Sequence, residues 1–105
     1  MVSQKALKQA TQVLVDNFKP ERIILFGSQA SGLADDHSDV DLLVVCKIKG
    51  KRRAMMVEMD RSLHGIGFAR DIIIITPDEF NRNSRIPGTI VRPARKYGKT
   101  LYERQ

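Results

Sequence analysis

The chain has few residues of the kinds that build disulfide frameworks or structural zinc sites. Its 105 residues include one cysteine, two histidines and no tryptophan. The single cysteine, Cys46, excludes an intramolecular disulfide, and two histidines add too few soft ligands for a structural zinc site. No apolar run approaches the ~18 residues of a membrane span, and residues 1–5 lack the apolar core of a secretory signal. We therefore expect a cytoplasmic protein with no membrane segment.

Charge is distributed unevenly along the chain. Lysine and arginine number 18 against 12 aspartates and glutamates, which gives a net charge of +6. A basic surface favours polyanions such as nucleic acid, nucleotides or an acidic protein, and net charge does not choose among them. The basic residues are dense in residues 47–53 and 82–104, whereas residues 35–41 hold four of the acids. An acidic cluster inside a basic protein indicates a metal-assisted phosphate site.

Hydrophobic spacing and turn residues predict alternating helices and strands in one domain over residues 1–105. The expected helices cover residues 4–18 and 52–63, and a third begins at Thr76-Pro77 with Glu79 as its capping-box residue. The expected strands cover residues 22–26, 39–45, 70–75 and 99–102. Pro87 can open a further helix that Pro93 would interrupt. This order predicts an α/β or α+β fold.

Two aspartates open the predicted strand 39–45. Residues two apart on a strand point to the same side, so Asp39 and Asp41 project together and Val40 faces the other way. Two carboxylates at this spacing repel unless a cation lies between them, and Mg²⁺ prefers carboxylate oxygens together with substrate phosphates. Two-metal phosphate chemistry needs carboxylates that can bridge the ions. Because a lone Asp-x-Asp also occurs in ordinary turns, the pair alone leaves both interpretations open.

A Gly-Ser pair ends the predicted strand 22–26. Gly27 lets a phosphate approach the backbone closely, and Ser28 adds a hydroxyl to the free N–H groups of the turn. On its own the pair indicates a tight turn. Joined to Asp39 and Asp41 by a short connection, it predicts a phosphate-binding turn beside a metal site.

A third carboxylate, Asp71, lies at the start of a strand that continues with four isoleucines. A charge entering a core strand is costly unless it is exposed, paired or bound to a metal. If this strand and strand 39–45 are neighbours, Asp71 can reach Asp39 and Asp41. The alternative is a salt bridge to Arg70 or to another arginine, and spacing alone does not decide between the two.

Residues 25–32 and 38–44 resemble the signature of the DNA polymerase β-type nucleotidyltransferase superfamily, with Gly27-Ser28 and Asp39-x-Asp41 as its specific part. Residues 87–103 are similar to the end of these domains. The small size resembles the minimal nucleotidyltransferase (MNT) branch. The resemblance covers residues 5–104 and implies a single-domain nucleotidyltransferase fold, in which a mixed sheet is flanked by helices.

The resemblance also implies an enzyme that transfers a nucleoside monophosphate from an NTP to a hydroxyl and releases pyrophosphate. Gly27 and Ser28 would hold the triphosphate of ATP. Asp39 and Asp41 would bind two Mg²⁺ ions, and Asp71 would be the third catalytic and metal-binding carboxylate. In one respect the sequence departs from the family: Gln29 and Ser31 stand where family members often have arginines.

MNT proteins are commonly paired with a helical HEPN protein that is an RNase toxin. The implied role is that of an antitoxin, which neutralises the toxin by transferring AMP to one of its tyrosines. A partner is also expected because 105 residues leave no room for a separate acceptor-recognition domain. Two alternatives remain: a nucleotide-binding antitoxin without turnover, and nucleotidyl transfer to RNA or to a small molecule.

Overall fold

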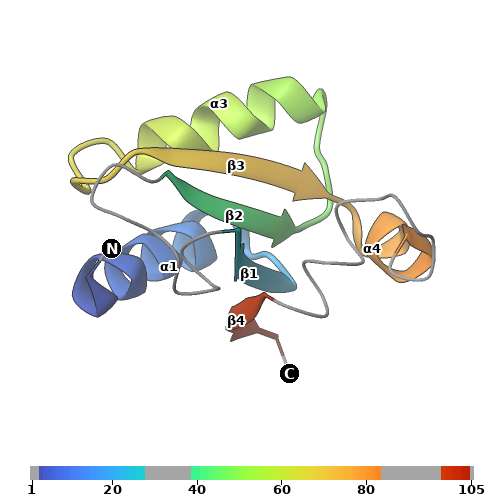
Figure 1. The fold of residues 1–105 in the computed structure, drawn as a ribbon. Helices are drawn as coiled ribbons and strands as arrows, with labels where there is room; N and C mark the ends of the chain where they lie inside the picture. The colour runs from blue at the N-terminus through green and yellow to red at the C-terminus, as the bar shows by residue number, and fades with distance from the viewer. Residues whose placement is uncertain (1–2, 28–38, 84–97, 105) are drawn as a thin grey trace.

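A computed structural model describes residues 3–27, 39–83 and 98–104 as three helices and four strands (Figure 1). The helices are α1 (Gln4–Phe18), α3 (Arg52–Ser62) and α4 (Pro77–Asn83). The strands are β1 (Arg22–Phe26), β2 (Val40–Val45), β3 (Arg70–Ile75) and β4 (Lys99–Glu103). None of the described helices has the length and apolarity that a membrane crossing requires.

The four described strands form one mixed sheet in the order β3-β2-β1-β4. β1 pairs antiparallel with β2 on one side and with β4 on the other. β2 and β3 run parallel, and α3 lies between them in the chain, as a parallel pair requires. The mixed sheet flanked by helices that the sequence predicts is therefore confirmed.

The two faces of the sheet bury different side chains. On one face Val40, Leu42 and Val44 of β2 belong to a core cluster that also contains the buried side chains of α1 and α3. On the other face Leu43 and Val45 form a second cluster with Phe80 of α4. Because side chains alternate along a strand, Asp41 lies on this second face, away from α1 and α3. Figure 1 shows α3 lying along β3, with α4 beyond the end of that strand.

The boundaries of the elements agree closely with the sequence predictions. The helix over 4–18 and the strands over 22–26 and 70–75 are confirmed to the residue. β2 begins one residue later than predicted, α3 ends one residue earlier, and β4 extends one residue further. Met55 and Met59 of α3 are buried in the core, and Met56 is half-buried. The helix predicted from Pro87 lies outside the described residues.

The capping box predicted at the start of α4 is confirmed. The backbone N–H of Glu79 donates to Oγ1 of Thr76 at 3.1 Å, and the N–H of Thr76 donates to Oε1 of Glu79 at 2.9 Å. The bond from Thr76, followed by one from Arg52, lowers the pKa of the Glu79 carboxyl. Arg52 joins α3 to this cap through an ion pair with Glu79 at 2.9 Å.

Replacing Thr76 by alanine should destabilise the protein, because it removes the acceptor for one of the unpaired N–H groups at the start of α4. We expect the free energy of unfolding to fall by about 1 kcal/mol, the usual cost of losing an N-cap. Urea denaturation measures this change. Thr100→Ala, on the exposed side of β4, should change stability by less than about 0.5 kcal/mol; equal losses in the two variants would contradict the capping role.

Candidate active site

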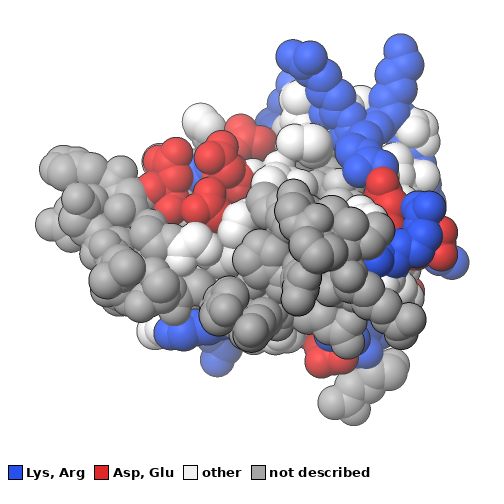
Figure 2. Space-filling view, turned by 45° about the vertical axis from the view of Figure 1, so that its right-hand side comes forward, with Lys and Arg blue, Asp and Glu red and all other residues white. Residues whose placement is uncertain are grey.

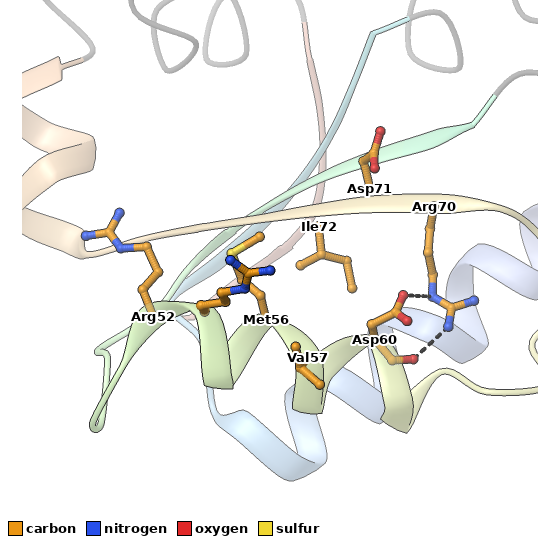
Figure 3. Close-up of a pocket in the computed structure, with 8 residues that line it drawn as sticks. Arg52, Met56, Val57, Asp60, Arg70, Asp71 and Ile72 are labelled. Atoms are coloured by element: carbon orange, nitrogen blue, oxygen red, sulfur yellow. Dashed lines mark hydrogen bonds and ion pairs between the residues drawn. The ribbon is translucent and has the colours of Figure 1, made fainter.

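Asp41 and Asp71 are direct neighbours across the parallel strands β2 and β3. The register pairs Asp41 with Asp71 and, one residue earlier, Val40 with Arg70. In Figure 3 Asp71 points to the opposite side of β3 from Arg70 and Ile72. Both aspartates therefore lie on the face of the sheet away from α3. Strand order thus confirms the proximity of Asp71 and Asp41 that the sequence left conditional.

Asp39 completes a group of three negative charges around Asp41. It is exposed and comes one residue before β2, two positions from Asp41. The pKa of the Asp41 carboxyl is raised, first because burial disfavours its charged form and then because of the negative charges of Asp71 and Asp39. The three carboxylates therefore repel one another in the folded chain.

Gly27 follows the end of β1 and lies against the same carboxylate. Its φ is +72°, a conformation that favours glycine. A Cβ added at this position would overlap Oδ2 of Asp41. The pairing of β1 with β2 explains the contact, since Phe26 is opposite Asp41 in the register. Gly27 is thus needed both for the turn and for the space that Asp41 occupies. Ser28, predicted as its phosphate-binding partner, lies outside the described residues.

The charges on the surface are separated. Figure 2 shows one patch of acidic side chains on one side of the view and most of the lysine and arginine side chains on the other, with a few further acidic side chains among the basic ones. Negative groups packed this closely attract a cation, and basic groups at a distance attract an anionic substrate. The distribution suits a reaction in which a metal-bound nucleotide approaches the protein.

Residues 8–105 match the family described as polymerase beta, nucleotidyltransferase. The chain belongs to this nucleotidyltransferase family. The resemblance found in the Gly-Ser and Asp-x-Asp segments is thereby confirmed, and the protein is a nucleotidyltransferase. No curated protein matches the chain.

Solved structures share the nucleotidyltransferase fold. One is a candidate nucleotidyltransferase from Sulfolobus solfataricus, with a TM-score of 0.66 and 24% identity over 95% of this chain and 79% of the other. A second is the toxin-antitoxin MntA-HepT, with a TM-score of 0.62 and 22% identity over 98% and 74% of the two chains. A third is a toxin-antitoxin with AMP-PNP, with a TM-score of 0.56 and 22% identity over 93% and 74%. At these identities the likeness establishes the fold.

The ion pair between Arg70 and Asp71 that the sequence allowed is not formed in this nucleotidyltransferase. Nε of Arg70 lies 2.9 Å from Oδ1 of Asp60 in α3, and its Nη2 donates to the backbone oxygen of Asp60 at 2.6 Å. Arg70 is on the α3 side of the strand, so the alternation of side chains separates it from Asp71. The arginine therefore anchors α3 and leaves the charge of Asp71 on the site face.

The three aspartates have the chemistry of a magnesium site. Carboxylate oxygens are the hard ligands that Mg²⁺ prefers, and a cation would relieve the repulsion that raises the pKa of Asp41. Among the described residues no three Asp, Glu, His or Cys side chains are grouped closely enough to hold a metal ion. The register brings Asp41 and Asp71 together, and the metal-binding and catalytic roles of Asp39, Asp41 and Asp71 stay predictions.

The close contact between Gly27 and Asp41 and the position of Phe26 were not found from the sequence. Phe26 is half-buried, packs against the second core cluster and pairs with Asp41 across the strands. Both contacts depend on the register of β1 against β2. An alternating hydrophobic pattern could have revealed that register, but β1 is a continuous apolar run and carries no such signal.

Proposed function

We propose that this nucleotidyltransferase transfers AMP from ATP, with Mg²⁺, to a hydroxyl on a partner protein, and that it acts in the cytoplasm as the antitoxin of a HEPN-type toxin. The observation that carries the proposal is the pairing of Asp41 with Asp71 beside Gly27. It joins two carboxylates from different strands to a turn whose positive φ favours glycine. The similar MntA-HepT and AMP-PNP structures support the choice of partner and nucleotide.

Each residue of the site would have its own role in the proposed reaction. Asp39, Asp41 and Asp71 would hold the metal, which when bound neutralises charge on the attacking and leaving oxygens. Gly27, whose turn lies against Asp41, would hold the triphosphate through backbone N–H groups. Asp71 lies on the outer described strand and would orient the acceptor hydroxyl and accept its proton. Holding the acceptor in line with the α-phosphate would lower the barrier, because the reacting groups no longer have to meet by diffusion.

A transfer assay tests the proposal. The protein is incubated with Mg²⁺, ATP labelled at the α-phosphate and a lysate of the host cells, and labelled protein is separated from labelled RNA. We expect label on one protein band with the wild type, and at least a hundredfold less with Asp39→Asn, about the loss that follows from several kcal/mol of metal stabilisation. The matched control is Asp16→Asn, an exposed aspartate of α1, which should label as the wild type does.

Each of the other outcomes of the transfer assay would support a different function. Label on RNA would replace the protein acceptor by an RNA acceptor. ATP binding without any label, together with toxin neutralisation that survives Asp39→Asn, would indicate an antitoxin that acts without turnover. Equal labelling by the wild type and Asp39→Asn would contradict the proposed role of the carboxylates.

A further inference from the structure

A groove runs between α3 and the outer strand β3. Its volume is ≈ 720 Å³, and α3 forms one wall while β3 forms the other (Figure 3). The lining residues from α3 are Arg52, Arg53, Met56, Val57 and Asp60, and those from β3 are Arg70, Asp71 and Ile72. Asp71 belongs to this lining while its side chain points to the opposite side of β3 from Ile72, so the groove and the aspartate group meet at this residue.

The β3 wall offers backbone groups for hydrogen bonding. Among the described strands β3 is an outer one, with β2 on its inner side. The oxygen of Ile75 accepts from Cys46 at the inner side, whereas the oxygen of Ile74 accepts from Nη1 of Arg52 at 3.2 Å. Backbone groups alternate in direction along a strand, so the N–H and C=O of Ile72 face outward, as those of Ile74 do. An extended peptide could pair with this edge.

The α3 wall offers an apolar contact and a free cation. Val57 is 49% exposed and is the one large hydrophobic side chain that is exposed among the described residues. Met56, half-buried, lies beside it in the lining. Arg52 and Arg70 are held by Glu79 and Asp60, whereas Arg53 makes no ion pair within the described part of the chain. The wall therefore suits an apolar side chain followed by an acidic one.

We propose that this groove docks an extended segment of the acceptor protein, which pairs with the β3 edge, places an apolar side chain on Met56 and Val57 and an acidic side chain on Arg53, and carries its reacting hydroxyl to Asp71. The inference rests on the proposed function. It deepens that function by naming the surface that selects the acceptor. Strand addition supplies affinity through the backbone and specificity through alternate side chains.

The position of Asp71 favours the acceptor over a second copy of this chain. Asp71 lines the groove and is the residue to which the acceptor hydroxyl is assigned, so a segment seated in the groove lies beside the proposed site. A dimer is therefore an outcome that would overturn the inference.

Two substitutions in the groove test the inference against two matched changes on the same helix. Val57→Glu and Arg53→Glu alter the wall, whereas Ala54→Glu and Arg61→Glu introduce the same side chain at exposed positions of α3 outside the lining. The acceptor is the protein band that the wild type labels, enriched from the host lysate. We expect KM for this band to rise about tenfold or more in each groove variant, as for loss of an interface anchor. kcat and ATP binding should stay unchanged, and both control variants should match the wild type.

The remaining outcomes separate the two proposals. If the wild type labels no protein, the proposed function fails and the groove inference falls with it. If all four variants label the acceptor as the wild type does, only the groove inference is overturned. A benzophenone cross-linker at position 57 gives a second readout: we expect an adduct with the labelled band, and an adduct with a second copy of the chain would overturn the inference.

Discussion

Asp41→Asn should abolish nucleotidyl transfer and, in the absence of metal, make the folded protein harder to unfold. The first effect follows because Asp41 is the central carboxylate of the three, and losing a metal ligand should reduce transfer by about a hundredfold or more. The second follows because the folded state holds the Asp41 carboxylate in an environment that raises its pKa. A neutral asparagine escapes both the burial cost and the repulsion from Asp71 and Asp39.

The pH dependence of stability gives the sign of this effect. An acid whose pKa is raised by folding binds its proton more tightly in the folded state, so its ionisation lowers stability as pH rises. The wild type should therefore lose stability relative to Asp41→Asn as pH increases from the ordinary value of 3.8 through the raised folded value. The gain of the variant should be absent below this range and complete above it.

Denaturation in the presence of a chelator measures this difference, and Asp16→Asn again serves as the matched control. Mg²⁺ should reverse the order of the two proteins, because a ligand stabilises only the protein that binds it. An Asp41→Asn variant that is less stable than the wild type at neutral pH without metal would show that the carboxylate has a structural partner, and would contradict the interpretation of the site.

Gly27→Ala should cost more stability than the same change at Gly50, Gly65 or Gly67. A side chain at φ +72° costs roughly 1–2 kcal/mol, and the overlap with Oδ2 of Asp41 adds the cost of overpacking, about 1–3 kcal/mol. We expect a loss of about 2–4 kcal/mol in the free energy of unfolding, measured in urea. Transfer should fall too, because Asp41 must move to admit the methyl group.

Gly50 provides a control in which only the backbone cost remains. Its φ is +73°, and a Cβ there would meet no atom within 4 Å. Gly50→Ala should therefore cost only about 1–2 kcal/mol and leave transfer intact. Combining Gly27→Ala with Asp41→Ala isolates the contact, because the two changes should be less than additive if the overlap is real. Strict additivity, or equal losses at Gly27 and Gly50, would rule out a close contact between Gly27 and Asp41.

Local patterns predicted the parts of this protein that local interactions determine. The capping box at Thr76 follows from four consecutive residues, and the shared face of Asp39 and Asp41 follows from the alternation of a strand. The signature segments gave the family because the Gly-Ser and Asp-x-Asp residues are each adjacent or nearly adjacent in sequence. Each of these predictions uses positions that are close in sequence.

Pairing between distant strands could not be obtained in the same way. The partner of Asp71 depended on whether β3 lies beside β2 and in which register, and Arg70, its immediate neighbour in sequence, was an equally good candidate. The structure resolves this because a strand separates the two side chains onto opposite faces. The groove was invisible for a related reason: Val57 and Ile72 become neighbours only after α3 packs on β3.

The position of β4 has a consequence for how the protein acquires its structure during synthesis. β1 lies in the middle of the sheet, and its second neighbour is β4, made after nearly all the other described residues. Two further contacts link the same parts of the chain. They are the ion pair of Arg22 with Glu103 and the hydrogen bond from the backbone N–H of Arg104 to the backbone oxygen of Glu21. Until residues 99–104 leave the ribosome, β1 has an unpaired edge that can recruit other chains. The nascent protein is therefore open to aggregation at the strand that leads into Gly27.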